Sequence, residues 1–429
     1  MAAYIVMSLP VSMWLMKFST DTLLITPAAM GGIYAIARIW DAVSDPMAGY
    51  LSDRTQSSFG RRRSWLFASV IPLGATFVMI WSPPAWLDGM LVVVWVAAAL
   101  VLWETASTAF YIPYSALGLE LTSDYHERTR LFAWRQMIMA FGFAGALTFI
   151  YMMRTAEDER AMALAVSSGI GVVVAVVIVL CALRTPEPVH HQGRGGVGLF
   201  ASFRDVARNP HALMLFFVFG IESFGMGIVS TLSAYIMDDL VERIDLIEAL
   251  MACWMIPQFV LVPLWIRYSR ALGKKRLWLC GMGCVGLGFS GMFFLSQNAW
   301  PLVFFCVVMI GAGTSISQVI GPSIQADVVD YDELKSGERK EGAYSAIWNF
   351  IRKAGSAGAA AIGGVALSYG GYDPSAEIQG EGVKDALRYT AGILPAAFFL
   401  LGIFVFSRFS LNETEHAAVV AEIQARNAE

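Results

Sequence analysis

The chain has 429 residues, of which 57% are hydrophobic and 15% charged, and its formal net charge is −4 at pH 7. A water-soluble fold could not bury this much apolar surface, and no basic face indicates nucleic-acid binding. The composition therefore predicts an integral membrane protein.

Uncharged stretches recur along the whole chain, each near the roughly 20 residues that a helix needs to cross a bilayer. They do not alternate between apolar and polar residues as a transmembrane β-barrel requires, so we predict an all-α membrane protein. The first run is not followed by a small-residue cleavage site, so it is predicted to be a span rather than a signal peptide. We predict twelve spans, over residues 3–28, 31–52, 64–84, 89–119, 132–153, 162–184, 210–237, 246–268, 277–297, 299–326, 341–370 and 388–408.

Basic residues predict the orientation of these spans. If the N-terminus is inside, the cytoplasmic segments hold most of the 30 Lys and Arg residues, as short cytoplasmic loops generally do. We therefore expect a multi-pass protein of the plasma (inner) membrane with both termini in the cytoplasm. The five cysteines all fall inside predicted spans, without the histidines or further cysteines that a metal site needs, and are expected to be packing residues.

The predicted domain organisation has two pseudo-symmetric halves. We predict an N-terminal six-helix bundle over 1–184, a cytoplasmic linker over 185–209, a C-terminal six-helix bundle over 210–410 and a cytoplasmic tail over 411–429. Repeated halves of this kind are typical of secondary transporters.

Two sequence echoes support the repeat. Gly60-Arg61-Arg62-Arg63 after the second predicted helix matches Gly273-Lys274-Lys275-Arg276 after the eighth. Pro113 and Pro322 are likewise each followed, some fifteen residues later, by a Glu-Arg pair. The basic loops alone would be topology signals, so the echoes support the repeat only in combination.

The second predicted helix carries Arg38, Asp41 and Asp45 at membrane depth. Such charges cost roughly 2.5–3.5 kcal/mol or more each, so they are expected to face the bundle interior. Asp41 and Asp45 are four residues apart and point to one helix face, where a Na⁺ ion or a proton could bind between them. The hydroxyls of Ser44 and Thr108 could complete the site. The alternative is a structural cluster of salt bridges.

The sequence leaves open the roles of the other charged residues within predicted helices. Lys353 precedes a run of small residues and could neutralise the aspartates when no cation is bound, although Arg352 competes for that role. Arg38 lies one turn from Asp41 and is the other candidate coupling residue. Glu104 and Glu222 could each be a second proton site or a paired structural residue.

At these residues the sequence resembles a known family. Arg38-Ile39-Trp40-Asp41-Ala42 to Asp45-Pro46, and Ala326-Asp327-Val328-Val329-Asp330-Tyr331 to Lys353-Ala354-Gly355-Ser356, are similar to two signatures of one branch of the major facilitator superfamily. This branch comprises the melibiose-permease-like glycoside-pentoside-hexuronide:cation symporters. The resemblance implies two six-helix bundles, alternating access, and sugar uptake driven by Na⁺, H⁺ or Li⁺.

The resemblance also implies roles for single residues. Asp41 and Asp45 fall on the family's cation-binding aspartates, Thr108 on its fourth-helix threonine, and Lys353 on its eleventh-helix lysine. Ser44 stands where melibiose permeases have an asparagine, which leaves the choice between Na⁺ and H⁺ open.

The predicted substrate site departs from the galactoside-binding members, because Tyr111 and Ser115 replace their fourth-helix Asp and Trp. Polar and aromatic groups inside apolar helices are the candidates for binding a sugar, and helix–helix hydrogen bonding is the alternative for each. An arginine would suit an acidic or sulfonated sugar. The candidate substrate-binding residues are Tyr111, Arg135, Trp348, Asn349 and Gln325.

These features predict a monomeric, cation-coupled symporter of a sugar, glycoside or uronate, with no cofactor other than the coupling ion. One alternative is a transporter of an amphiphile such as a lysophospholipid. A remote alternative is an intramembrane enzyme or sensor; but such aspartyl enzymes place their two acids on different helices, so we expect no enzymatic activity.

Overall fold

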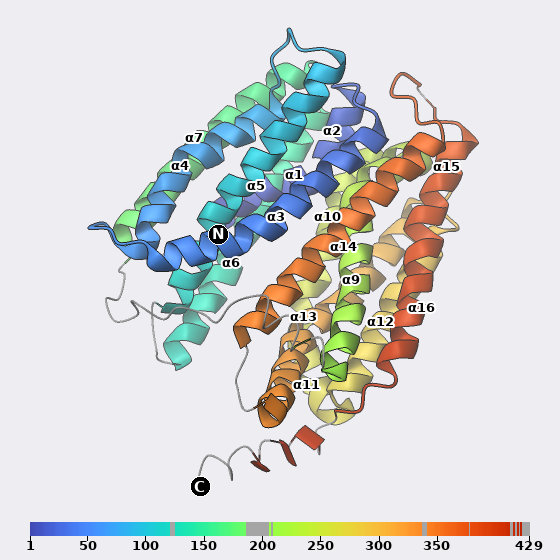
Figure 1. Ribbon diagram of the computed structural model, residues 1–429. Helices are drawn as coiled ribbons and strands as arrows, with labels where there is room; N and C mark the ends of the chain where they lie inside the picture. The colour runs from blue at the N-terminus through green and yellow to red at the C-terminus, as the bar shows by residue number, and fades with distance from the viewer. Residues whose placement is uncertain are drawn as a thin grey trace. The chain divides into compact units, whose positions relative to one another are not determined.

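A computed structural model describes residues 1–120, 125–185, 206, 209–336, 341–376, 378–411, 415–416, 418–419 and 421–422, and within these ranges it contains helices and no strands (Figure 1). The chain divides into two compact units, one formed by Met1–Gly195 with Asp373–Ala376 and the other by Gly196–Tyr372 with Glu377–Glu429. Most of the predicted linker and tail lies outside the described residues.

The helices of the first unit run from α1 to α7, blue to green in Figure 1. Their bounds are α1 Ala2–Met13, α2 Leu15–Asp21, α3 Pro27–Arg54, α4 Arg61–Trp81, α5 Gly89–Glu120, α6 Tyr125–Arg154 and α7 Glu159–Arg184. The pair α1 and α2 forms one span bent by 48°, and Pro10 inside α1 removes a helical hydrogen bond just before the bend.

The first predicted span extends beyond the end of its helix in the structure. Instead of reaching residue 28, its helix ends at Asp21, and α3 begins at Pro27. The side chain of Thr26 accepts a hydrogen bond from the Ala29 amide, and Pro27 occupies the first turn, where its missing N–H group costs nothing. This cap separates the two spans.

The second unit holds the helices from α9 to α16. Their bounds are α9 Pro210–Tyr235, η2 Ile236–Leu240, η3 Ile244–Leu246, α10 Ile247–Val260, α11 Val262–Leu272, α12 Lys274–Met292, α13 Trp300–Ser336, α14 Glu341–Tyr369, α15 Glu381–Arg388, η4 Tyr389–Ile393 and α16 Leu394–Phe406. The pair α10 and α11 is bent by 42°, with Pro257 inside α10 and a proline in the first turn of α11.

Every predicted span has a helix in the structure. Among the described residues, seven helices are long and apolar enough to cross a membrane, or nine if each bent pair counts as one span. The others are α3, α12 and α14, and each has charged residues within it or at its start. Several helices exceed their predicted bounds. For example, α6 begins at Tyr125 rather than 132 and α13 continues to Ser336 rather than 326, because a helix satisfies its own backbone in water as it does in lipid.

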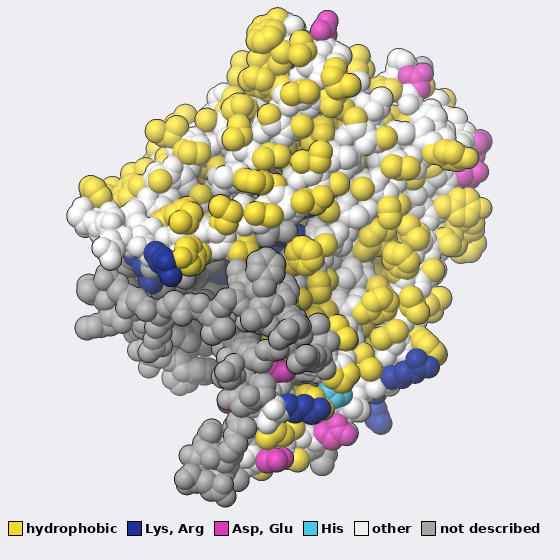
Figure 2. Space-filling model, in the orientation of Figure 1, with side chains coloured by type: hydrophobic (Ala, Val, Ile, Leu, Met, Phe, Trp, Pro, Cys, Tyr) yellow, Lys and Arg dark blue, Asp and Glu magenta, His cyan; other side chains and the backbone are white. Residues whose placement is uncertain are grey.

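Large apolar side chains lie exposed along the helices of both units. Figure 2 shows hydrophobic side chains over the lengths of the helices, with charged groups near helix ends. A water-soluble protein rarely exposes so many large apolar side chains, and their exposure is typical of a surface that contacts lipid hydrocarbon. Examples are Ile71, Met90, Phe141, Val172, Val260, Leu287, Phe294, Leu400 and Phe404.

Glycines bring helices of the first unit into close contact. A Cβ atom on Gly142 of α6 would lie 2.6 Å from the backbone oxygen of Ala2 on α1, and one on Gly145 would lie 2.9 Å from Val6. Contacts this short leave no room for a side chain. The packing of α6 on α1 therefore depends on these two glycines.

Candidate cation site

Two pairs of side chains meet where α3 packs against α5. Asp41 and Asp45 lie one helical turn apart on α3, and Glu104 and Thr108 lie one turn apart on α5. A spacing of four residues puts both members of each pair on one helix face. Asp41, Glu104 and Thr108 are buried, with 1%, 6% and 4% of their surfaces exposed.

Thr108 joins the two aspartates. Its Oγ1 lies 3.0 Å from Asp41 Oδ1 and 2.9 Å from Asp45 Oδ1, both within hydrogen-bond distance. The structure thus brings together Asp41, Asp45 and Thr108, three of the four residues that the sequence predicts as cation ligands.

Arg38 balances part of the negative charge. Its Nη1 lies 3.2 Å from Glu104 Oε1 and 3.4 Å from Asp41 Oδ2. The salt-bridge cluster that the sequence left as an alternative is thus present for Asp41, and Glu104 is part of it. The four-residue spacing of Glu104 and Thr108 was the sequence signal that Glu104 belongs to this cluster. The spacing places both side chains on the helix face that meets Asp41.

Ser44 is buried beside the aspartates, and its hydroxyl donates to the backbone oxygen of Asp41 at 3.3 Å. The hydroxyl proton of Ser44 is therefore directed along the helix. The lone pairs of its oxygen could coordinate a cation. Trp40 faces another direction, because its indole N–H donates to Thr105 at an exposed position, at 2.7 Å.

The predicted substrate residues of the first unit are Tyr111 on α5 and Arg135 on α6. Tyr111 follows Thr108 by three residues, and its ring stacks on Tyr4 of α1 with centroids 5.5 Å apart. Arg135 is half-buried on α6. Tyr111 thus presents an aromatic ring one helical turn from Thr108 on α5.

The remaining predicted residues belong to the second unit. Trp348 on α14 stacks on Phe219 of α9, with ring centroids 3.8 Å apart, and Asn349 is exposed and accepts a 3.5 Å hydrogen bond from Arg352. Gln325 is half-buried on α13, and Lys353 is half-buried on α14.

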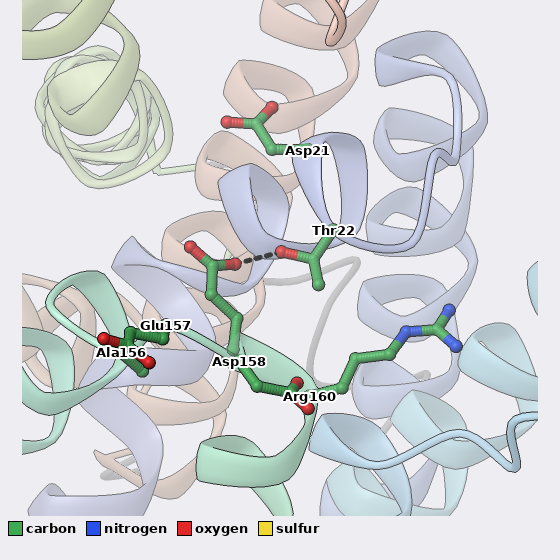
Figure 3. Close-up of a pocket in the computed structure, with 7 residues that line it drawn as sticks. Asp21, Thr22, Ala156, Glu157, Asp158 and Arg160 are labelled. Carbon is green, nitrogen blue, oxygen red and sulfur yellow. Dashed lines mark hydrogen bonds between the residues drawn. The ribbon is translucent and has the colours of Figure 1, made fainter.

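An acidic hollow of about 700 Å³ lies elsewhere in the first unit, where the end of α2 meets the loop between α6 and α7 (Figure 3). Asp21 there pairs with Lys17 at 2.9 Å, and the Thr22 hydroxyl donates to Glu159. Asp158 accepts a hydrogen bond from the Ala161 amide, and the hollow holds none of the predicted site residues. Its lining residues are Asp21, Thr22, Ala156, Glu157, Asp158, Glu159 and Arg160.

Within the described residues, no group of three or more His, Cys, Asp or Glu side chains could hold a metal ion. A cation at Asp41 and Asp45 would therefore depend on the hydroxyl and backbone oxygens around them, which are ligands typical of hard cations.

The fold and this buried charge cluster are those of a membrane transporter, and comparisons with known proteins give the family. Residues 1–413 match the family described as MFS/sugar transport protein. The chain belongs to this family, as its resemblance to the glycoside and hexuronide symporters predicted. The major facilitator fold is confirmed too: a crystal structure of a mutant of the nucleoside transporter NupG superposes with a TM-score of 0.71 at 12% identity, over 95% of this chain and 98% of that one.

Three relatives illustrate the range of the family. A putative sulfoquinovose importer of Escherichia coli is 26% identical, with 97% of this chain and 90% of that protein aligned. A glucuronide carrier protein homolog of the same organism is 25% identical, with 97% and 91% aligned. The sodium-dependent lysophosphatidylcholine symporter 1-A of Danio rerio is 24% identical, with 96% and 84% aligned.

Proposed function

We propose that this protein carries a sugar across the membrane together with Na⁺ or H⁺, and that Asp41, Asp45, Ser44 and Thr108 bind the cation. The main support is the position of Thr108 between two carboxyl groups. A hydroxyl has one proton and can donate it to one acceptor at a time. The second oxygen–oxygen contact is favourable only when a carboxyl is protonated or a small cation offsets the negative charge.

The charge balance supports the same proposal. Arg38 is one positive charge that contacts the buried acids Asp41 and Glu104, and Thr108 lies between Asp41 and Asp45. Carboxylates at membrane depth are costly when ionised, so a bound cation or proton is proposed to stabilise the cluster. A site that is stable only when occupied can couple ion binding to a conformational change.

In the proposed cycle, two six-helix bundles joined by the segment 185–209 alternate between inward-open and outward-open states, with both termini in the cytoplasm and the chain acting as a monomer. Lys353 is the proposed coupling residue, because an ammonium group that competes with the cation for the aspartates would link ion binding to the cycle. Arg38 keeps its pairs with Glu104 and Asp41.

The proposed substrate is an anionic sugar or glycoside. Two relatives are named for sulfoquinovose and for a glucuronide, which carry a sulfonate and a carboxylate. A half-buried arginine such as Arg135 can bind either group through two parallel hydrogen bonds. We propose Tyr111, Arg135, Trp348, Asn349 and Gln325 as substrate-binding residues, with the aromatic rings stacking on the sugar.

A second candidate function is the transport of an amphiphile. It is favoured by the relative named as a sodium-dependent lysophosphatidylcholine symporter, which aligns with 96% of this chain. Replacement of the galactoside-binding Asp and Trp by Tyr111 and Ser115 is consistent with either substrate.

The test is uptake into proteoliposomes of labelled sulfoquinovose, a glucuronide, melibiose and lysophosphatidylcholine, each with a Na⁺ gradient, a pH gradient or neither. We expect accumulation of an anionic sugar only when a gradient is present. Gradient-driven uptake of lysophosphatidylcholine alone would support the second function, and uptake of no compound under any gradient would contradict both.

The cation site itself is tested by Thr108→Val, with Thr105→Val as the matched control on the same helix. We expect Thr108→Val to raise the cation concentration for half-maximal stimulation about tenfold, which is ~1.4 kcal/mol, because a hydrogen bond to a charged group is lost. The exposed Thr105 contacts Trp40 and not the aspartates, so its variant is expected to behave as wild type. Equal effects of the two variants would remove Thr108 from the cation site.

A further inference from the structure

A second buried acid lies in the other unit, outside the proposed cation site. Glu222 on α9 is 5% exposed. Its Oε1 accepts hydrogen bonds from the indole N–H of Trp278 on α12, at 2.6 Å, and from the hydroxyl of Ser317 on α13, at 2.7 Å. Both donors are neutral, whereas the acids of the first unit have Arg38 beside them.

Charged side chains on the neighbouring elements do not pair with Glu222 within the described residues. On α14, which packs most closely on α9, the contacts involve Gly220, Ser223 and Gly227, a face of α9 different from that of Glu222. The next helix, α16, has no charged residue. Lys274 pairs with Asp327 at 2.6 Å, and Lys275 donates to the Ser407 backbone oxygen at 2.6 Å. Leaving aside the charged residues at the ends of α13 and α14, the other charged residues of these helices are Arg276, Asp330, Arg352 and Lys353. Among the described residues, none forms an ion pair with Glu222.

Burial with neutral donors favours the uncharged form of a carboxyl group. Moving an ionised carboxylate out of water costs far more free energy than two hydrogen bonds from neutral donors return. A protonated carboxyl keeps its carbonyl oxygen as the acceptor for Trp278 and Ser317, so the observed contacts suit the neutral acid.

The repeat places this acid in a context like that of the first site. Thr108 stands five residues before Pro113 in α5, and Ser317 stands five residues before Pro322 in α13. Each hydroxyl is bonded to a buried carboxyl group of a neighbouring helix. Corresponding hydroxyls in the two halves therefore each donate a hydrogen bond to a carboxyl group of a neighbouring helix.

Glu222 is also connected to the predicted substrate region by direct packing. A Cβ atom on Gly321 would lie 3.6 Å from the ring of Trp348 and 3.7 Å from the ring of Trp278. The indole that donates to Glu222 and the indole proposed to stack on substrate thus converge on one glycine.

We propose that Glu222, with Trp278 and Ser317, is a proton-binding site of the second unit, which holds a proton at neutral pH and exchanges it with water during the transport cycle. The reaction is the gain or loss of one proton at the carboxyl group, with no other bond made or broken. It requires neither the Asp41–Asp45 site nor a known substrate.

The test is infrared spectroscopy of the full-length protein in lipid, comparing wild type with Glu222→Gln. At neutral pH we expect the variant to lack one C=O stretching band of a protonated carboxyl group. In the wild type this band is expected to shift in D₂O and to be replaced by carboxylate bands as the pH is raised. The matched control is Glu381→Gln, at a side chain 76% exposed, which is expected to lose carboxylate bands only.

Trp278→Phe and Ser317→Ala keep the proposal testable if Glu222→Gln does not fold. Each removes one hydrogen bond to the carbonyl oxygen and is expected to move the same C=O band to higher frequency. Loss of carboxylate bands rather than a C=O band in Glu222→Gln would overturn the proposal. So would a C=O band that neither shifts in D₂O nor responds to pH, because the acid would then be a fixed structural group.

Discussion

Among single residues, Glu104 is a third acid that is linked to Asp41 of the aspartate pair through a shared arginine. It lies 3.2 Å from the Arg38 guanidinium, which also lies 3.4 Å from Asp41. One arginine thus contacts both acids. Under the proposed function Asp41 binds the cation, and Glu104 is a positioning residue that acts through Arg38.

Glu104→Gln tests this role. Without the acid, the full charge of Arg38 falls on Asp41 and opposes cation binding, so we expect the cation concentration for half-maximal stimulation of uptake to rise about tenfold, ~1.4 kcal/mol. The substrate affinity at saturating cation is expected to change much less. Asp88→Asn, an exposed acid just before the same helix, is the control, and an unchanged cation dependence in Glu104→Gln would contradict the role.

At the level of helices, glycine contacts determine how closely α1 packs on α6. α1, which carries Tyr4 beside Tyr111, packs on α6 through Gly142 and Gly145. Backbone atoms at these contacts cannot rotate away as a side chain can. The close approach therefore requires glycine at these positions.

We expect Gly142→Ala to destabilise the first unit by about 1–3 kcal/mol, because the new Cβ atom would lie 2.6 Å from the Ala2 backbone oxygen. The matched control is Gly169→Ala on α7, where no atom lies within 4 Å and alanine is the better helix former. The measurement is thermal unfolding in detergent, followed by tryptophan fluorescence. Equal midpoints for the two variants would show that the contact is not tight.

For the whole molecule, the central prediction concerns coupling. In Lys353→Val we expect substrate exchange down its gradient to continue while cation-driven accumulation is lost, because the variant lacks the ammonium group that is proposed to compete with the cation. The measurement is counterflow compared with gradient-driven uptake in the same proteoliposomes. Normal accumulation in Lys353→Val, or its loss in Arg352→Val instead, would assign coupling to another residue.

The sequence alone predicted the helical membrane class, helices at all twelve spans and the acidic pair on one helix face. These features depend on local hydropathy and on a spacing of four residues, which any helix converts into a shared face. It did not predict the loop between α2 and α3, although Thr26 and Pro27 carried the cap signal, nor the bends within two spans.

Tertiary structure decided what those residues contact. It showed that Thr108 joins Asp41 and Asp45, that Glu104 shares Arg38 with Asp41, and that Glu222 has two neutral donors. These partners are separated by 56 to 95 residues in the sequence. The physical reason is that periodicity determines which way a side chain points along its own helix, whereas only the packing of helices against each other determines what it meets there.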